Sequence, residues 1–346
     1  MARPVGAIRV EGSCPPLRVA AFTDRTAGSS RFRVRQYIEP LGRLGIAIDE
    51  KMSRLGAYPP RNRPLRPAWL VGTLAERLLQ IASSRSADVI LLQREMVSTL
   101  PTLEGWTRPP RIIDIDDAIH LYRGGLAARH LAKLADLVVV GNSWLAEIWR
   151  RWNREVEILP TPIDTACYRP SPPPERPTIG WIGSAGNLRY LHAIAPALAR
   201  VMKRFPDVEI AVCCDRPPQL PGVSLRHVPW SPAAECPFLA SLSIGVMPLA
   251  DGPWERGKCS FKMLQYMAAG RPCVVSPVGM NREILGQAEL GCAAETLEEW
   301  TEALSNLLGD RDAAQRLGDA GRALAVARYS VAALAPRLAD LLRRLA

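Results

Sequence analysis

The chain has 346 residues, 48% of them hydrophobic, and carries 44 Lys and Arg against 34 Asp and Glu, a formal net charge of +10. This composition can form a hydrophobic core and excludes an intrinsically disordered protein, and the length predicts two domains of ordinary size. No apolar run is long enough to span a bilayer, and no secretory signal is recognisable near the N-terminus, so we expect a cytoplasmic protein.

The excess positive charge lies mainly in the first half of the chain. Residues 1–170 contain 25 Lys and Arg against 17 Asp and Glu, whereas residues 171–346 contain 19 against 17. Almost all of the basic residues are Arg, since only five Lys are present. Two of these five, Lys258 and Lys262, are four residues apart, which indicates a specific role for them.

The eight cysteines show no Cys-x-x-Cys spacing, and most of them lie in apolar segments. This pattern favours neither a zinc site nor a disulfide framework, and disulfides are rare in cytoplasmic proteins. We therefore predict buried free thiols. The cysteines are Cys14, Cys167, Cys213, Cys214, Cys236, Cys259, Cys273 and Cys292.

The first half alternates predicted strands with predicted helices. The strands are short and continuously apolar, and the helices carry apolar residues at helical spacing. Buried strands that alternate with helices are typical of a parallel sheet covered on both faces, so we predict a Rossmann-like domain over residues 1–165. Its strands are expected at 17–22, 89–93, 111–115 and 137–140.

A proline-rich segment separates this domain from a second series of strands and helices. Seven prolines lie between residues 159 and 177, and proline at this density prevents regular backbone hydrogen bonding. We predict a linker over 166–177, a second Rossmann-like domain over 178–330, and a C-terminal helix over 331–346 that can pack back on the first domain. Strands of the second domain are expected at 178–182, 208–213, 223–227, 243–247 and 273–276.

The predicted fold class is therefore α/β, with two Rossmann-like domains facing a central cleft. Ligands of such sheets bind beyond the carboxyl ends of the strands. Gly183, Ser184, Asn187 and Arg189 follow a strand of the second domain and precede a helix, where glycine lets a ligand approach the backbone and free N–H groups attract phosphate. The alternative is a tight turn without a ligand.

A second loop of this domain, 251–260, contains Asp251 and Glu255 and leads into a predicted helix near Lys258 and Lys262. Lysines spaced by four residues lie on one face of a helix. Positive charge near a helix N-terminus opposes the helix dipole, and an anion between the lysines would relieve this. The interpretation is a phosphate ligand, and the alternative is a solvated basic face.

The segment from Lys262 to Asn281, KMLQYMAAGRPCVVSPVGMN, resembles the second-domain signature of the GT-B glycosyltransferases called group 1 or family 4. The resemblance extends to residues 180–191, 243–251 and 158–164. It implies a nucleotide-sugar donor held by the second domain, an acceptor held by the first, transfer with retention of configuration, and no essential metal ion.

Two positions depart from the family's usual pattern. Aligned on the signature, Gln265 stands where a glutamate contacts the nucleotide ribose, and Gly257 stands where an acid contacts the sugar. Glutamine can still hydrogen-bond two hydroxyls, but glycine cannot replace a carboxylate. Either Asp251 or Glu255 supplies that role, or sugar recognition differs, or the activity has been lost.

The resemblance also implies roles at the end of a strand in the first domain. Asp116 and Asp117 match a His-Asp pair that lines the acceptor side of the cleft in similar transferases, and His120 follows closely. We predict these three as catalytic residues that orient the acceptor hydroxyl. An acid capping a helix, or a divalent metal bound by the carboxylates, are the alternatives, and we expect no metal.

Ser30, Arg31 and Arg35 lie where this family contacts its acceptor, and the arginines could hold a phosphate or carboxylate group. A solvated arginine face is the alternative. Four arginines within 54–66 precede an amphipathic helical pattern over 69–81, which suits either contact with an anionic membrane or an ordinary core-facing helix.

We therefore predict a glycosyltransferase that moves a sugar from a nucleoside diphosphate sugar to a polysaccharide, lipid-linked or other small acceptor. No cofactor, metal or nucleic-acid partner is expected, and peripheral contact with the inner face of the membrane is a further expectation. A nucleotide-sugar epimerase on the same fold, and a degenerate protein that only binds the nucleotide sugar, are the alternatives.

Overall fold

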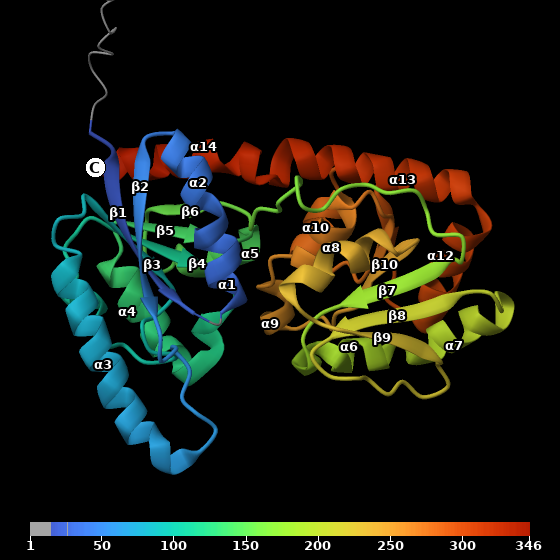
Figure 1. Ribbon diagram of the computed structural model, residues 1–346, viewed down its shortest axis with the longest axis horizontal. Coiled ribbons are helices and arrows are strands. Elements are labelled where there is room, and N and C mark those ends of the chain that lie inside the picture. The colour runs from blue at the N-terminus through green and yellow to red at the C-terminus, as the bar shows by residue number, and fades with distance from the viewer. Residues whose placement is uncertain (1–14, 26) are drawn as a thin grey trace, which may run out of the picture.

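The protein contains two parallel β-sheets, each covered by helices. The computed structural model describes residues 15–25 and 27–346. Each sheet has six strands, in the order β2-β1-β3-β4-β5-β6 for the first and β12-β11-β10-β7-β8-β9 for the second. The two halves lie side by side (Figure 1). The predicted α/β class, with two Rossmann-like halves and a helical C-terminus, is confirmed.

The first sheet contains two strands that the sequence did not reveal, β2 and β6. Strand β2 lies at the edge of the sheet and carries Asp49, Glu50 and Lys51, so it lacks the apolar run of a buried strand. The strands are β1 (Leu17–Asp24), β2 (Ile46–Ser53), β3 (Val89–Gln93), β4 (Arg111–Ile115), β5 (Leu137–Val140) and β6 (Val156–Ile158).

Alternate residues of these strands form two separate apolar clusters. Phe22 and Leu92 belong to the cluster on one face of the first sheet, whereas Val19 and Val89 belong to the cluster on the other. This alternation follows from the two-residue period of a strand. The helices of this half are α1 (Gly28–Ser30), α2 (Gln36–Arg43), α3 (Arg66–Ser83), α4 (Leu126–Leu134) and α5 (Ser143–Trp149), and a π-helical turn, Arg31–Arg35, joins α1 to α2.

The second sheet follows the predicted strands closely, and it adds one short strand at its edge, β12. Its strands are β7 (Thr178–Ile182), β8 (Glu209–Cys214), β9 (Leu225–Pro229), β10 (Ile244–Met247), β11 (Cys273–Val275) and β12 (Gly291–Ala293). Its helices are α6 (Leu188–Ala193), α7 (Ala195–Arg204), α8 (Pro232–Ala240), α9 (Pro253–Arg256), α10 (Phe261–Ala268), α11 (Met280–Leu285), α12 (Leu297–Gly309) and α13 (Arg311–Leu324).

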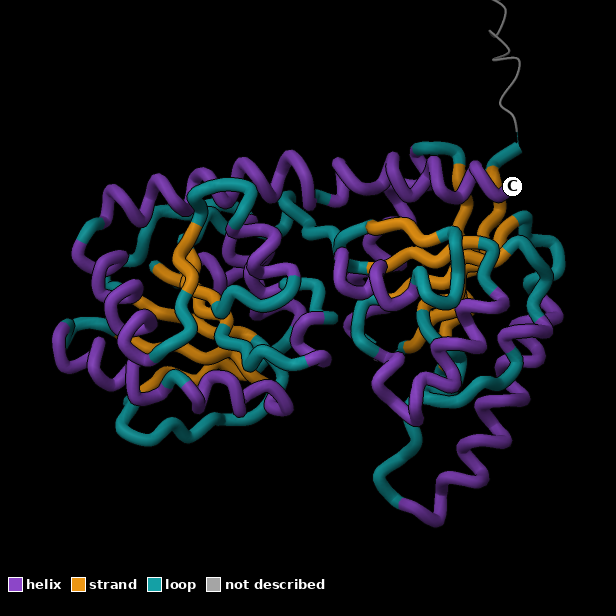
Figure 2. Tube along the Cα trace, turned by 180° about the vertical axis from the view of Figure 1, so that it is seen from behind, coloured by secondary structure: helices purple, strands orange, loops and turns teal. Residues whose placement is uncertain are grey.

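The last helix crosses from the second half to the first. Helix α13 and helix α14 (Val331–Leu345) together run along one side of both halves, as both views show (Figures 1 and 2). Leu334, Leu338 and Leu342 of α14 belong to the same apolar cluster as Val19 of β1. The C-terminal helix therefore packs on the first sheet and ties the two halves together.

The prediction of free thiols is wrong for two cysteines. Cys167, in the proline-rich crossing segment, forms a disulfide with Cys236 of α8. The partners are 69 residues apart, so no short spacing in the sequence could reveal the pair. Five cysteines of the described residues are free, and Cys14 lies outside the described residues. The free ones are Cys213, Cys214, Cys259, Cys273 and Cys292.

Glycine at position 245 sets the distance between helix α10 and the second sheet. A Cβ atom at Gly245 would lie 2.2 Å from the ring of Tyr266. That ring is held in place because its hydroxyl donates a hydrogen bond to the carbonyl of Val246, 3.1 Å away. Helix α10 can therefore approach β10 closely only because residue 245 has no side chain.

We expect Gly245→Ala to lower the free energy of unfolding by about 1–3 kcal/mol, because it overpacks a rigid contact. Chemical denaturation measures this change. The matched control is Gly309→Ala, where no atom lies within 4 Å of the added Cβ. That control should be neutral or stabilising by up to about 1 kcal/mol. Equal stability of the two variants would contradict the packing argument.

Candidate functional site

A cavity of about 350 Å³ lies between the two halves, at the carboxyl end of strand β7. Most of its wall comes from the second half, but Phe32 enters from the first and its ring centroid lies 4.0 Å from that of Phe261. The cavity thus depends on both halves of the chain. Its lining residues are Phe32, Ile182, Gly183, Ser184, Asp215, Trp230, Glu235, Phe261, Lys262 and Gln265.

Lys262 is the main positive charge in this cavity. Its ammonium lies 5.6 Å from the centroid of the Trp181 ring, and no carboxylate in the described part of the chain forms an ion pair with it. Burial and the nearby charge of Lys258 lower the pKa of Lys262 to about 8. An unpaired ammonium in apolar surroundings is costly, so the cavity is suited to an anion.

Gly183 makes room for this lysine. A Cβ at residue 183 would lie 2.7 Å from the Cε of Lys262 and equally close to the Trp181 ring. The glycine that the sequence suggested for ligand approach therefore also allows the lysine to reach the cavity. Ser184 lines the cavity beside it, and Asn187 donates a hydrogen bond to the Ser184 hydroxyl, 3.0 Å away.

Gln265 lies at the end of a hydrogen-bonded chain that crosses between the halves. Its amide donates to the hydroxyl of Tyr168, 3.2 Å away, and that hydroxyl donates to Glu235 at 2.8 Å. Arg31 of the first half forms an ion pair with Glu235 at 3.0 Å. The chain places a carboxylate and an arginine in or beside the cavity, and neither Tyr168 nor Glu235 was singled out by the sequence.

Asp251, Glu255 and Arg189 are engaged with protein partners and do not line the cavity. Glu255 accepts hydrogen bonds from Tyr190 and from Arg189, the latter at 3.3 Å. Asp251 forms an exposed two-point contact with Arg256, at 2.7 and 3.0 Å. The pKa of Asp251 is lowered mainly by its hydrogen bond to Arg256.

Lys258 lies beside the cavity, with its ammonium 5.4 Å from the centroid of the Trp254 ring. No carboxylate pairs with it among the residues that the structure describes. The two lysines that the sequence grouped are therefore both available to an anion, and their charges lie close enough for Lys258 to lower the pKa of Lys262.

In the first half, Asp116 and Asp117 are bound by a third residue, Arg94. The Arg94 guanidinium donates to Asp116 at 2.7 Å through Nε and to Asp117 through a second nitrogen. Arg94 has a φ of 64°, which is strained for a residue with a side chain. Strain of this kind occurs mostly where the surroundings demand it, and here it directs the guanidinium to both acids.

His120 lies in an aromatic environment. Its ring centroid is 5.3 Å from that of Trp144 and 6.3 Å from that of Trp152. Burial is the main cause that lowers the pKa of His120, and Arg151 lowers it further. Its Nδ1 has no hydrogen-bond partner among the described residues. Within the predicted catalytic trio, Arg94 therefore binds the two acids, whereas the histidine packs against tryptophans.

The predicted acceptor-binding residues lie on helix α1 and the π-helical turn that follow β1. Ser30 is buried and accepts a hydrogen bond from the backbone of Asp24 at 2.9 Å. Arg35 donates to Glu50 at 2.8 Å, and Arg31 reaches the cavity residue Glu235. Ser30 and Arg35 therefore make contacts within the first half, whereas Arg31 turns toward the second.

Arg33, between these two arginines, is the most buried of the three. It contacts Asp114 through Nε at 3.0 Å and donates to the carbonyl of Leu159 at 2.7 Å. Burial acts to lower its pKa, but Asp114 outweighs this and the pKa of Arg33 is raised. The sequence pattern did not distinguish Arg33, because the π-helical turn changes which residues share a face.

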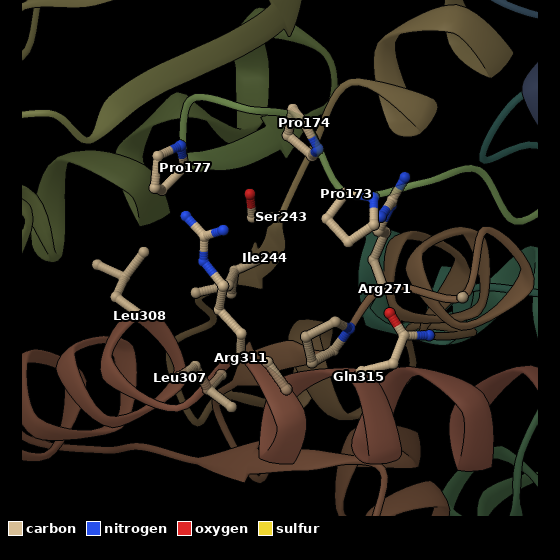
Figure 3. Close-up of a pocket in the computed structure, with 13 residues that line it drawn as sticks. Pro173, Pro174, Pro177, Ser243, Ile244, Arg271, Leu307, Leu308, Arg311 and Gln315 are labelled. Atoms are coloured by element: carbon tan, nitrogen blue, oxygen red, sulfur yellow. The ribbon is translucent and has the colours of Figure 1, made fainter.

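A second cavity, of about 70 Å³, lies beside the second sheet, at the opposite ends of its strands (Figure 3). Pro177, Ser243 and Pro272 come immediately before the strands β7, β10 and β11, so this cavity lies at their amino ends. Arg311 and Gln315 of α13 form part of its wall. It is separate from the cavity that contains Lys262.

Residues 176–310 match the protein family described as Glycosyl transferases group 1. The resemblance inferred from the second-half signature is therefore confirmed. No curated protein sequence matches the chain.

Solved structures share the fold at low sequence identity. Sucrose-phosphate synthase from Thermosynechococcus elongatus is 16% identical with a TM-score of 0.71, over 94% of this chain and 98% of that one. HepE from Anabaena in complex with UDP and glucose is 13% identical with a TM-score of 0.68, over 95% and 100%. WaaG, a glycosyltransferase involved in lipopolysaccharide biosynthesis, is 13% identical with a TM-score of 0.67, over 93% and 99%. The chain has the GT-B fold that these structures share.

The depressed pKa of Lys262 can be measured directly, because the chain contains only five lysines. In protein labelled with carbon-13 lysine, we expect the Lys262 side chain to titrate near pH 8, well below the ordinary lysine value of about 10.4. The Lys262→Met variant assigns the signal. Lys258→Met should raise the pKa of Lys262, because it removes a like charge. Titration of Lys262 above pH 10 in the unaltered protein would contradict the proposed burial.

Proposed function

We propose that this chain, whose residues 176–310 form a group 1 glycosyl transferase domain within a GT-B fold, transfers a sugar from a nucleoside diphosphate sugar to an acceptor bound by its first half. The observation that carries the proposal is the unpaired ammonium of Lys262 in a cavity between the halves. Lys258 adds a second unpaired charge nearby, and two lysines match the charge of a diphosphate.

The lysines would act on the leaving group. Negative charge builds on the diphosphate as its bond to the sugar breaks, and fixed positive charge in a site shielded from water stabilises that change. Gln265, held by Tyr168, would hydrogen-bond the ribose hydroxyls. Ser184 and the backbone next to Gly183 would contact the phosphates, since both residues line the cavity beside Lys262.

We propose that transfer retains the configuration of the sugar and needs no metal ion. An inverting transferase needs a free base opposite the leaving group. Asp116 and Asp117 of the first half each form an ion pair with Arg94, and a carboxylate in an ion pair is a poorer base. The departing diphosphate is then the group best placed to take the acceptor proton. The same arginine supplies the positive charge that a metal would bring to these carboxylates.

We further propose that the acceptor is a glycan or a lipid-linked molecule reached at an anionic membrane surface on the cytoplasmic side. Helix α3 projects from the first half (Figure 1). Val71 and Leu79 on this helix are 68% and 74% exposed, and Arg61, Arg63 and Arg66 lie at its N-terminal end. An apolar face with flanking arginines suits an interfacial helix. None of the described helices is long and apolar enough to cross a membrane.

The transfer can be tested by following the release of nucleoside diphosphate from a panel of nucleotide sugars, with and without membrane extract. We expect acceptor-dependent release, and Lys262→Met should lower kcat/KM by about 100-fold or more. Lys203→Met, which removes an exposed lysine, is the matched control and should retain full activity. Altered sugar without an acceptor would indicate an epimerase, and binding without turnover would indicate a degenerate protein. Either result would overturn the proposal.

Membrane contact is tested by sedimentation with phosphatidylglycerol vesicles. We expect the double variant Val71→Glu, Leu79→Glu to bind about tenfold less tightly or weaker still, because each buried apolar side chain contributes about 1.5–3 kcal/mol. Val326→Glu changes an exposed apolar residue between α13 and α14 and serves as the control. Equal binding of all three proteins, or binding to neutral phosphatidylcholine alone, would contradict the proposed surface.

A further inference from the structure

Gly257, which stands where the family signature has an acid, makes a contact between the two halves. A Cβ at residue 257 would lie 2.8 Å from the Cβ of Ala118 and 3.0 Å from its backbone nitrogen. Ala118 belongs to the first half and follows Asp116 and Asp117 directly. No side chain fits at position 257 while the halves are in contact, so the missing carboxylate reflects this contact.

Asn142 of the first half forms hydrogen bonds across the same contact. Its carbonyl oxygen accepts a hydrogen bond from Leu145 and so caps helix α5, while its amide group donates to the carbonyls of Arg256 and Lys258, each at 3.0 Å. The Asn142 side chain is buried. The loop that carries Lys258 is therefore bonded, on both sides of Gly257, to the first half.

Neither acid of that loop replaces the missing carboxylate. Glu255 is bound to Tyr190 and Arg189, and Asp251 is bound to Arg256 at the surface.

The contact between Gly257 and Ala118 brings Asp117 of the first half close to position 257. Burial raises its pKa, whereas Arg94 and Lys258 favour its charged form. Its charge also acts on Lys262, in the cavity wall. Arg94 binds one oxygen of the Asp117 carboxylate, and the other has no hydrogen-bond donor among the described residues. This oxygen is free to accept a hydrogen bond from a hydroxyl group.

We propose that Asp117 supplies, from the first half, the sugar-binding carboxylate that the second half lacks at position 257. The donor sugar would then be held by residues of both halves and recognised fully only when Gly257 contacts Ala118. Arg94 would act as a positioning residue that directs the Asp117 carboxylate toward the sugar hydroxyls. This inference rests on the proposed function, because it presumes a nucleotide sugar in the cavity beside Lys262.

The test compares binding of UDP with binding of UDP-glucose by calorimetry, using the full chain. Loss of a carboxylate that contacts the sugar changes the ratio of the two dissociation constants, whereas an effect transmitted through the lysines changes both constants alike. We expect Asp117→Asn to weaken UDP-glucose relative to UDP by about tenfold or more, the loss typical of a hydrogen bond to a charged group. If UDP does not bind, the ADP and GDP pairs replace it.

Two further variants separate the contact from the carboxylate. Gly257→Ala introduces a methyl group that collides with Ala118 and leaves the Asp117 side chain unaltered. Asn142→Asp keeps the cap of α5, but it replaces the amide donor by an oxygen that repels the carbonyls of Arg256 and Lys258. Both should weaken UDP-glucose relative to UDP as Asp117→Asn does. Gly42→Ala, where no atom lies within 4 Å of the added Cβ, is the control and should leave the ratio unchanged.

The outcomes distinguish this inference from the proposed function. If no nucleoside diphosphate binds, the proposed function fails and the inference fails with it. If UDP binds, and the ratio of the dissociation constants for UDP-glucose and UDP is the same in the unaltered protein, in Asp117→Asn and in Gly257→Ala, only the inference is overturned. Thermal melting checks that each variant is folded, and Gly257→Ala and Asn142→Asp decide the question if Asp117→Asn is not.

Discussion

The arrangement of this protein depends on a half-buried lysine, Lys262, that has no carboxylate partner among the described residues. Lys262 lies against Trp181 in a cavity lined by Phe32 and Phe261, and desolvation depresses its pKa to about 8. Such a charge is costly without a partner, and an anion in the cavity would compensate for it. Gly183 leaves room for the lysine side chain, because a Cβ at residue 183 would collide with it.

Several buried or partly buried charges near the cleft are instead paired with an opposite charge. Arg33 is bound to Asp114, Arg94 to Asp116 and Asp117, and Glu235 to Arg31. Paired charges hold segments together, because breaking such a pair leaves an uncompensated charge in a poorly solvated place. Lys258 and Lys262 differ from these pairs, because no carboxylate of the described residues pairs with either lysine, and this difference motivates the proposed anion site.

The two halves share the site. The second half contributes the lysines and Gln265, and the first contributes Phe32, Arg31 and the acids held by Arg94. Two contacts hold the halves together. Helix α14 follows the second half in the chain and packs on the first sheet, and the Asn142 amide of the first half donates a hydrogen bond to a loop of the second. Transfer between a donor on one half and an acceptor on the other requires the two to meet in a water-poor cleft. Under the proposed function, the cavity at the carboxyl end of β7 would be that meeting place.

The sequence by itself determined the layers of the fold and the loops of the second half. Continuously apolar strands and helical periodicity depend on local residues, so most strands were predicted, while β2 was missed because its edge position leaves charged residues along it. Tertiary structure alone decided which candidate charges are free. Asp117 and Arg94 are 23 residues apart, Arg31 and Glu235 are 204 apart, and Cys167 and Cys236 are 69 apart. Pairing is a property of distance in space, and packing of both halves sets that distance. The net charge of +10 therefore says little about the site until the pairs are known, because most arginines around it are neutralised and two lysines are not.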